Sequence, residues 1–147
     1  MKLTIELVPE SCWYSNVRSE ITRSAWDAIR AEIYKAADYK CEICGGVGSR
    51  HPVECHEIWH YDDKKHVQTL KGFIALCPRC HEVKHIGLAQ VRDRYDVALL
   101  HFCEVNKVSK TEAERYVHNV FQTWSKRSQH KYTLDISILA KMLGREK

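Results

Sequence analysis

The chain has 147 residues, 29% charged and 44% hydrophobic, which suits one ordinary soluble domain with a modest core. Its formal net charge of +4 is compatible with a polyanionic partner, but a solvated surface would give the same value. No apolar run approaches the ~20 residues that a membrane-spanning helix needs, so no contact with a membrane is expected.

The N-terminal part predicts a strand and then a helix. The first ten residues include two glutamates and no long apolar stretch, so no secretory signal is expected and the protein is predicted to be cytoplasmic. Residues 1–8 alternate loosely in polarity, which predicts a short edge strand. Apolar residues then recur at helical spacing, which predicts a helix from an N-cap at Ser24 to about Tyr39.

The C-terminal part predicts helices. Residues 88–105 carry one apolar stripe at helical spacing. Residues 109–128 predict a second amphipathic helix with Ser109 as its N-cap. Residues 134–144 predict a third helix, which ends at a glycine. Such stripes normally pack against a core, so no cofactor role is assigned to them.

The cysteines of the middle region give the strongest signal. The chain has seven cysteines, an odd number, so a fully paired disulfide framework would leave one over. Two C-x-x-C pairs are present, and each can present two thiolates to one tetrahedral zinc ion. The alternative is a pair of redox dithiols. The predicted zinc ligands are Cys41, Cys44, Cys77 and Cys80.

Two histidines follow the second cysteine pair. Four cysteines would complete a closed, structural zinc site, which would leave His81 and His85 free. On a helix that starts near Cys80 these histidines lie four residues apart and share one face, where they would form half of a second metal site. Two alternatives stay open: one histidine replaces a cysteine as a zinc ligand, or both are ordinary surface residues.

The 32 residues between Cys44 and Cys77 are many for a plain zinc ribbon. They include "VECHEIWHYDDKKH", and residues 53–59 and 71–76 have strand character. The order is strand, loop, strand, knuckle and helix. His56 would therefore project from the first strand toward the helix face that carries the two later histidines.

The segments "CEICGG", "CHEIWHYDD" and "ALCPRCHEVKHIG" together resemble the HNH endonuclease family. The resemblance covers residues 38–88 and rests on zinc knuckles and histidines interleaved in the family's order. It implies an α+β fold: a zinc-stapled ββα-metal module within a single domain, 1–147. The module would be flanked by an N-terminal strand and helix, 1–37, and a helical extension, 89–147. These flanks are similar to those of small, often phage-associated members.

The resemblance implies a metal-dependent endonuclease that hydrolyses phosphodiester bonds of DNA, with RNA as a further candidate substrate. His56 falls at the position of the general base, which takes a proton from water. His81 falls on the final histidine, a ligand of the catalytic cation, and His85 would be a second ligand or a phosphate contact. The expected cations are a structural Zn²⁺ and a catalytic Mg²⁺ or Mn²⁺, and imidazole ligands favour Mn²⁺, Ni²⁺ or Zn²⁺ over Mg²⁺.

Two departures from the family pattern bear on these roles. Cys55 stands where the family has an acidic residue or a histidine as a metal ligand. Either Cys55 takes that role, or the register shifts so that His56 binds the metal and Glu57 contributes to catalysis. The family's middle asparagine is also absent. The candidates for its orienting role are His66 and Gln68.

Asp62 is a further candidate for a supporting role, although aspartates in such a position are more typical of a solvated turn. The departures favour one alternative function, a catalytically inactive, zinc-stapled module that binds nucleic acid. A third reading is a protein-interaction domain that uses its helical C-terminal half. The sequence predicts neither the oligomeric state nor the target.

Overall fold

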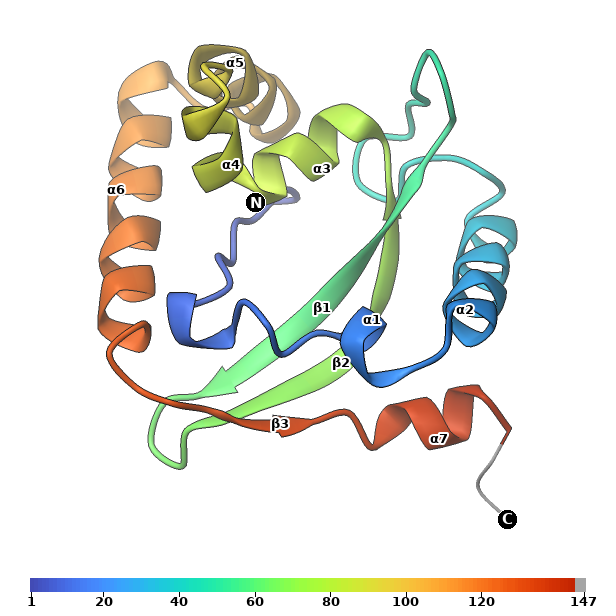
Figure 1. The fold of residues 1–147 in the computed structure, drawn as a ribbon. Helices are drawn as coiled ribbons and strands as arrows, with labels where there is room; N and C mark the ends of the chain where they lie inside the picture. Colours follow the sequence, from blue (N-terminus) through green and yellow to red (C-terminus); the bar gives the residue numbers. More distant parts are fainter. Residues whose placement is uncertain (145–147) are drawn as a thin grey trace.

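The computed structural model describes residues 1–144 as an α+β fold with a three-stranded mixed sheet (Figure 1). The strand order is β1-β2-β3, with β1 and β2 antiparallel and β2 and β3 parallel. The elements, in chain order, are η1 (Glu10–Cys12), α1 (Val17–Glu20), α2 (Arg23–Ala36), β1 (Glu54–Asp62), β2 (Val67–Leu76), α3 (Pro78–Lys84), α4 (Ile86–Val91), α5 (Tyr95–Asn106), α6 (Lys110–Arg127), β3 (Thr133–Asp135) and α7 (Ile138–Met142).

The long β1–β2 hairpin is the centre of the fold. Its register runs from Glu54 opposite Leu76 to Asp62 opposite Val67. The register shifts after Ile58, where β2 carries one residue more than β1, and the neighbouring Gly72 has a φ of +151° that favours glycine. Side chains alternate between the two faces of a strand, so each face of β1 meets different neighbours. The hairpin is longer than the two predicted strands.

Two hydrophobic clusters flank this hairpin. One joins helices α3 to α6 to the N-terminal segment and the end of β2, and Phe102 is fully buried in it. The other packs α2 and α7 against the hairpin around Trp26 and Leu70. Figure 1 shows α2 on one side of the hairpin and helices α3 to α6 on the other. Two separate clusters hold the hairpin between them.

The predicted edge strand in residues 1–8 is wrong, because this segment is extended without a strand partner. Its backbone is held by side chains instead. The Asn106 side chain accepts from the N–H of Leu3 and donates to the Leu3 carbonyl, both at 2.9 Å. The N–H of Ile5 donates to the Tyr116 hydroxyl at 2.9 Å. The alternation in polarity is real, because Leu3 and Ile5 are buried while Thr4 and Glu6 line a cavity.

The helix predicted from Ser24 to about Tyr39 exists with different ends. Its N-cap is Thr22, whose hydroxyl accepts from the N–H of Ala25, so α2 begins at Arg23. It ends at Ala36, because Asp38 and Tyr39 have positive φ values of 54° and 57°. This reversal leads the chain directly into Cys41.

The stripe in residues 88–105 predicted one helix, but the structure divides it. Helix α4 ends at Val91, and α5 starts at Tyr95 after a turn in which Asp93 has a φ of 58°. Val91 is 83% exposed and so lies outside the core that the stripe predicted for it. The predicted N-cap of α6 is correct, because the Ser109 hydroxyl accepts from the N–H of Glu112.

The C-terminal part contains a strand that the sequence did not reveal. Strand β3 pairs with the start of β2 before the short α7, and Gly144 follows with a φ of +66°. Within residues 1–144, no helix is both long and apolar enough to cross a membrane. The division of a single domain, 1–147, into a module at 38–88 and flanks at 1–37 and 89–147 stays a prediction.

Candidate metal centres

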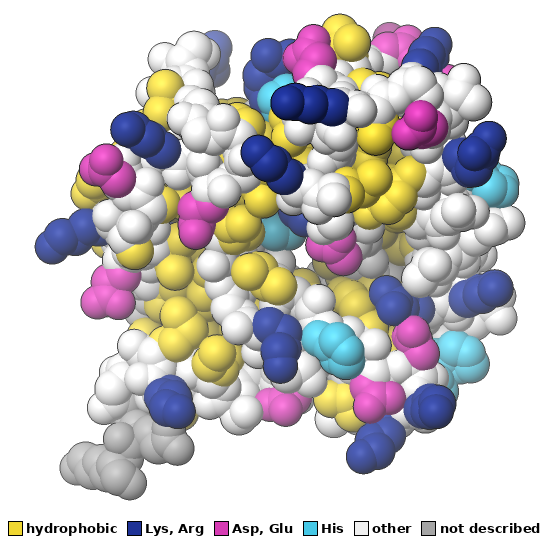
Figure 2. All heavy atoms as spheres, turned by 180° about the vertical axis from the view of Figure 1, so that it is seen from behind, with side chains coloured by type: hydrophobic (Ala, Val, Ile, Leu, Met, Phe, Trp, Pro, Cys, Tyr) yellow, Lys and Arg dark blue, Asp and Glu magenta, His cyan; other side chains and the backbone are white. Residues whose placement is uncertain are grey.

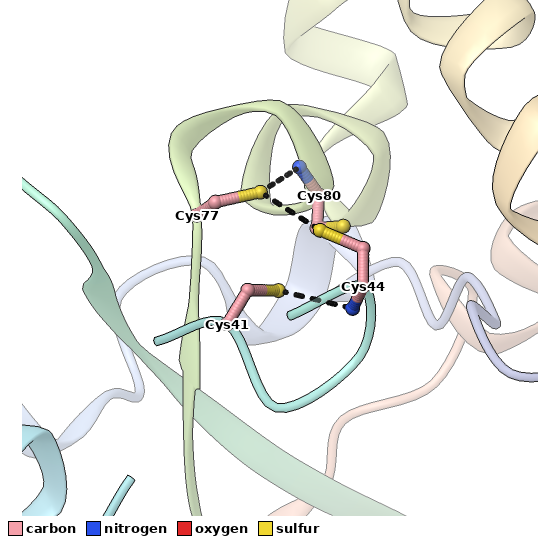
Figure 3. Close-up of side chains that lie close together, drawn as sticks. All are labelled: Cys41, Cys44, Cys77 and Cys80. Atoms are coloured by element: carbon pink, nitrogen blue, oxygen red, sulfur yellow. Dashed lines mark hydrogen bonds between the residues drawn. The ribbon is translucent and has the colours of Figure 1, made fainter. Parts of the chain in front are cut away.

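Two tight turns present the four cysteines to one another. The Cys41 sulfur accepts from the N–H of Cys44 at 3.5 Å. The Cys77 sulfur caps the N-terminus of α3 and accepts from the N–H of Cys80 at 3.4 Å. Figure 3 shows both turns and their four side chains converging. The second turn follows β2 directly and the first lies beside it, so the hairpin brings together cysteines that are far apart in sequence.

The geometry of this cluster is consistent with a zinc ion. The sulfurs all lie within 4.8 Å of one another, and those of Cys44 and Cys77 are 3.6 Å apart. Zinc–sulfur bonds of about 2.3 Å in a tetrahedron place the sulfurs about 3.8 Å apart. Three of the four cysteines are buried, and Cys44 is exposed. The prediction of a four-cysteine cluster is confirmed.

Contacts within the cluster shift the thiol pKa values in opposite directions. The hydrogen bond from the Cys80 thiol outweighs burial and lowers the pKa of Cys41 to about 4. The same hydrogen bond, together with burial, raises the pKa of Cys80, and burial raises the pKa of Cys77 to about 11. A divalent cation would favour the thiolate at every position.

A histidine that the sequence analysis did not single out contacts this cluster. His101 on α5 is buried, and its Nε2 lies 3.2 Å from the Cys80 sulfur. Its Nδ1 is also buried and has no hydrogen-bond partner within residues 1–144. The metal-ligand set consists of the four cysteines, so His101 does not replace one of them. Its N–H is instead placed to donate to a thiolate.

Three histidines form a second group that could hold a metal ion. His56 comes from β1, His81 from α3 and His85 from the C-cap of α3. One nitrogen from each ring lies within 4.8 Å of the others. The ring centroids of His81 and His85 are 5.2 and 5.1 Å from that of His56. The predicted convergence of these three side chains is confirmed.

The two centres are separate although Cys80 and His81 are neighbours in sequence. Successive residues on an α-helix are rotated by about 100°, so the two side chains point to different sides of α3. Cys80 is fully buried beside the other cysteine sulfurs, while the His81 side chain is 23% exposed and faces β1. Neither His81 nor His85 belongs to the cysteine group, so the first alternative for them is not observed.

Glu54 fixes the orientation of His81. One carboxylate oxygen lies 2.8 Å from Nδ1 of His81 and the other lies 2.8 Å from Nε2 of His51. Burial alone would raise the pKa of Glu54, but the hydrogen bonds from these two histidines leave the pKa below its ordinary value. An ionised carboxylate only accepts hydrogen bonds, so His81 carries its proton on Nδ1 and directs the Nε2 lone pair toward His85.

Sequence reasoning missed Glu54, although a signal was present. Glu54 is two residues before His56 in a predicted strand region, and residues two apart in a strand share a face. In the structure Glu54 is the first residue of β1. Metal-binding histidines are usually oriented by a hydrogen bond to a carboxylate, and Glu54 is placed to have this role for His81.

Two rings of the histidine group, those of His56 and His85, have lowered pKa values that keep them neutral. Burial, followed by the charges that His85 and His81 would carry, lowers the pKa of His56 to about 2. Burial and then His81 lower the pKa of His85 to about 4. Neutral imidazoles are the form that binds a metal ion. At neutral pH these rings need not lose a proton before a cation enters.

The histidines line a cavity of about 420 Å³, here called the histidine cavity. Its opposite wall is the N-terminal segment, where Thr4 and Glu6 accept from the buried ammonium group of Lys84, both at 3.1 Å. Lys2 and Arg18 also line it. Figure 2 shows a face that is hollowed near its centre, where histidine, acidic and hydrophobic side chains meet.

Two residues beside His56 in sequence line the histidine cavity but do not belong to the histidine group. Cys55 packs with the cluster of α2 on the opposite face of β1, and burial raises its pKa to about 12. The Glu57 carboxylate accepts from the N–H of Val17 at 3.1 Å, and burial raises its pKa. Successive side chains of a strand point to opposite faces, so Cys55 and Glu57 project differently from His56. Neither residue belongs to the group that could hold the metal ion.

The other predicted supporting residues lie at the far end of the hairpin. Asp62 accepts from the N–H groups of Lys64 and Lys65, which makes it a turn residue. His66 stacks on His130 with the ring centroids 4.5 Å apart. At about 3.3 Å per residue, the six residues from His56 to Asp62 span about 20 Å.

Gln68 is also placed elsewhere. Its side chain is fully buried, and it donates to the carbonyl of Ser15 at 3.4 Å. Gln68 is opposite Tyr61 in the hairpin, toward the turn, whereas His56 is opposite Ile74 at the other end. The structure does not bring Asp62, His66 or Gln68 to the histidine group.

In comparisons with known proteins, no family model, curated protein or solved structure matches this chain. The fold and the two centres therefore define its class: a small α+β protein with a four-cysteine cluster and a histidine triad. Each of these groups could hold one metal ion.

Proposed function

We propose that this protein is a metal-dependent endonuclease of the HNH type that hydrolyses phosphodiester bonds of DNA. One observation carries the proposal: three imidazoles converge from a β-hairpin and the helix that follows it, next to a four-cysteine cluster that joins residues 41–44 to the start of that helix. This is the order of elements on which the sequence resemblance rests.

In the proposed site, His56, His81 and His85 hold one divalent cation. Metal–nitrogen bonds of about 2.0–2.1 Å place neighbouring ligands roughly 3.0–3.4 Å apart, and the Nε2 atoms of His81 and His85 are 3.1 Å apart. Three imidazoles favour Mn²⁺, Ni²⁺ or Zn²⁺ over Mg²⁺. When bound, such a cation would stabilise negative charge on a phosphodiester and lower the pKa of water.

The proposal changes the role of His56 that the resemblance implied. The centroid of the His56 ring lies 5.2 Å from that of His81 and 5.1 Å from that of His85. The centroids of His81 and His85 are 4.7 Å apart, so the three rings are about equally close to one another. As a third ligand, His56 would hold the cation and would not be free to take a proton from water. Glu54 would orient His81, while Lys2 and Arg18 would attract the phosphate backbone to the histidine cavity.

The test is a cleavage assay with the purified full chain. Supercoiled DNA, linear DNA and single-stranded RNA are incubated with Mn²⁺, Ni²⁺, Zn²⁺, Mg²⁺ or a chelator. Cleavage of DNA is expected with the transition metals and not with the chelator. Absence of cleavage with every metal and substrate would overturn the proposal.

Variants then test the site. His56→Ala and His85→Ala are each expected to lower the cleavage rate at least ~100-fold, the scale of loss when a metal centre or general base is removed. Zinc content should not change. His60→Ala is the matched control, because His60 is an exposed histidine on the same strand. A His56→Ala variant that cleaves as fast as wild type would show that the site is wrong.

A second candidate is a zinc-stapled module that binds nucleic acid without cleaving it. The observation that favours it is the ligand set, because neither Cys55 nor Glu57 belongs to the histidine group and Glu54 is engaged by two histidines. Mobility shifts of DNA that persist in every metal, with no cleavage product, would select this candidate.

A further inference from the structure

A second cavity adjoins the histidine cavity. It has a volume of about 530 Å³, within the usual ~300–1,000 Å³ of ligand sites. It lies between the N-terminal segment, α4 and α6, with β1 beneath. The residues that line both cavities are Val8, Glu57, Trp59 and His85. A ligand held at His85 could therefore extend into the second cavity without leaving the protein surface.

Aromatic rings dominate this second cavity, here called the aromatic cavity. Three of the chain's four tryptophans line it, together with Phe121. The indole N–H groups of Trp13 and Trp124 both donate to the carbonyl of Val8, at 3.1 and 3.0 Å. These bonds satisfy the polar edge of each indole and fix the two rings, which leaves a preorganised aromatic wall.

A glycine keeps part of the aromatic cavity open. Gly87 lies in α4 and lines the cavity, two residues after His85. Its φ is not positive, and a Cβ there would meet only Phe121, at 4.0 Å. Neither backbone conformation nor close packing requires glycine at this position. A larger side chain would fit locally and would fill the passage beside His85.

The two cavities differ in charge. Lys2, Arg18 and Lys84 line the histidine cavity together with Glu6 and Glu57, whereas no lysine or arginine lines the aromatic cavity among the described residues. The polar side chains of the aromatic cavity are mostly neutral, with Asn16 and Gln90 among them. A nucleotide has the same division, with a charged phosphate beside a flat, neutral base that carries hydrogen-bonding edges.

We propose that the aromatic cavity binds the base of the nucleotide whose phosphate lies in the histidine cavity. This inference rests on the proposed function and adds a substrate subsite to it. Stacking on aromatic side chains is tolerant of base identity, because every base has a π face. The subsite therefore takes any base that is out of a duplex stack, as in single-stranded or locally opened DNA.

The test compares two small ligands by calorimetry on the full chain in Mn²⁺. One is 2′-deoxyadenosine 5′-monophosphate, and the other is 2-deoxyribose 5-phosphate, which has the same phosphate and sugar but no base. The nucleotide is expected to bind about 5- to 150-fold more tightly, the range that base stacking gives. Equal affinities, or no binding of either ligand, would overturn the inference.

Variants test whether the aromatic cavity causes the preference for the nucleotide. Gly87→Leu should fill the passage beside His85, which leads into the aromatic cavity, and abolish the preference for the nucleotide. Trp13→Ala should reduce the preference at least about 5-fold. Tyr14→Ala is its matched control, because Tyr14 is 91% exposed and does not line the cavity. Circular dichroism and zinc content check that each variant is folded. A preference that survives Gly87→Leu in a folded protein would place the base elsewhere and overturn the inference.

The two proposals can fail separately. DNA cleavage by a protein that binds both small ligands equally would leave the nuclease standing and remove the subsite. A base-dependent preference that Gly87→Leu abolishes, in a protein that cleaves no nucleic acid, would leave the subsite standing and remove the nuclease.

Discussion

The Nε2 atoms of His81 and His85 lie 3.1 Å apart and face each other. His81 uses its Nδ1 proton for the Glu54 carboxylate, so its Nε2 presents a lone pair. A proton on the Nε2 atom of His85 could form a hydrogen bond with this lone pair. A cation would instead accept a lone pair from each ring and from His56, whose ring is in edge contact with both. The hydrogen bond between His81 and Glu54, which is not a member of the triad, therefore orients His81 for binding a metal ion.

This dependence on Glu54 gives the first prediction. Glu54→Gln keeps the size of the side chain but offers a neutral amide to His81, which weakens the bond that selects its tautomer. Loss of such an outer partner typically lowers metal affinity about 10- to 100-fold. Titration calorimetry with Mn²⁺ or Ni²⁺ on the zinc-loaded protein measures this change.

The control for Glu54→Gln is His51→Ala, which removes the other partner of the same carboxylate. The His51 side chain is 53% exposed, so its hydrogen bond is expected to add little to metal binding. If the two variants had the same affinity as wild type, the orienting role of Glu54 would be wrong.

Zinc removal gives the second prediction. The four cysteines join residues 41–44 to the start of α3, and three of them are buried in the core. Binding of a structural zinc typically contributes about 10–16 kcal/mol in apparent free energy, which exceeds the ordinary stability of a small domain. Cys41→Ser or a strong chelator should therefore abolish the cooperative thermal transition.

Cys103→Ser is the control for this prediction, because Cys103 lies on α5 outside the cysteine group. Differential scanning calorimetry and a zinc assay should show one zinc per chain and a retained transition for Cys103→Ser. A fully cooperative transition in the chelated wild type would contradict a structural role for zinc.

The third prediction concerns His101, which lies 3.2 Å from the Cys80 sulfur. An N–H that donates to a metal-bound thiolate stabilises its charge, so His101→Leu should lower zinc affinity about 10- to 100-fold without changing the stoichiometry of one. Competition with a chromogenic chelator measures the affinity. His118→Leu replaces an exposed histidine on α6 and should match wild type. Stoichiometry that fell to zero in His101→Leu would assign His101 a larger role than that of a hydrogen-bond donor.

Much of the candidate site could be predicted from the sequence because its signals are local. The C-x-x-C turns depend only on residues that are close together in the sequence. The same is true of the spacing of His81 and His85. To predict the position of His56, it was enough to expect that two strands form a hairpin before α3. These are short-range patterns, and the structure contains the cysteine group and the histidine group that they predicted.

The errors have a different origin, because they depend on contacts between distant segments. Residues 1–8 have a strand-like alternation, but Asn106 and Tyr116 satisfy their backbone in place of a neighbouring strand. Strand β3 has three residues and forms by pairing with β2. The roles suggested for His66 and Asp62 assumed that nearness in sequence meant nearness in space, whereas a hairpin carries its turn away from its open end.

Asn106 gives the last prediction, because it links the helical half to the wall of the histidine cavity. Its amide makes two hydrogen bonds with the backbone of Leu3, which is fully buried. Asn106→Ala would leave that N–H and carbonyl without partners, at a cost of about 1–3 kcal/mol in the free energy of unfolding. Urea unfolding measures this loss. Asn119→Ala is the control, since Asn119 is exposed on α6 and its substitution should change stability by less than about 0.5 kcal/mol. Hydrogen exchange should also become faster at Leu3 and Ile5 in Asn106→Ala, because their segment loses an anchor. Unchanged exchange at these two amides would mean that packing of the buried side chains, and not Asn106, holds the wall in place.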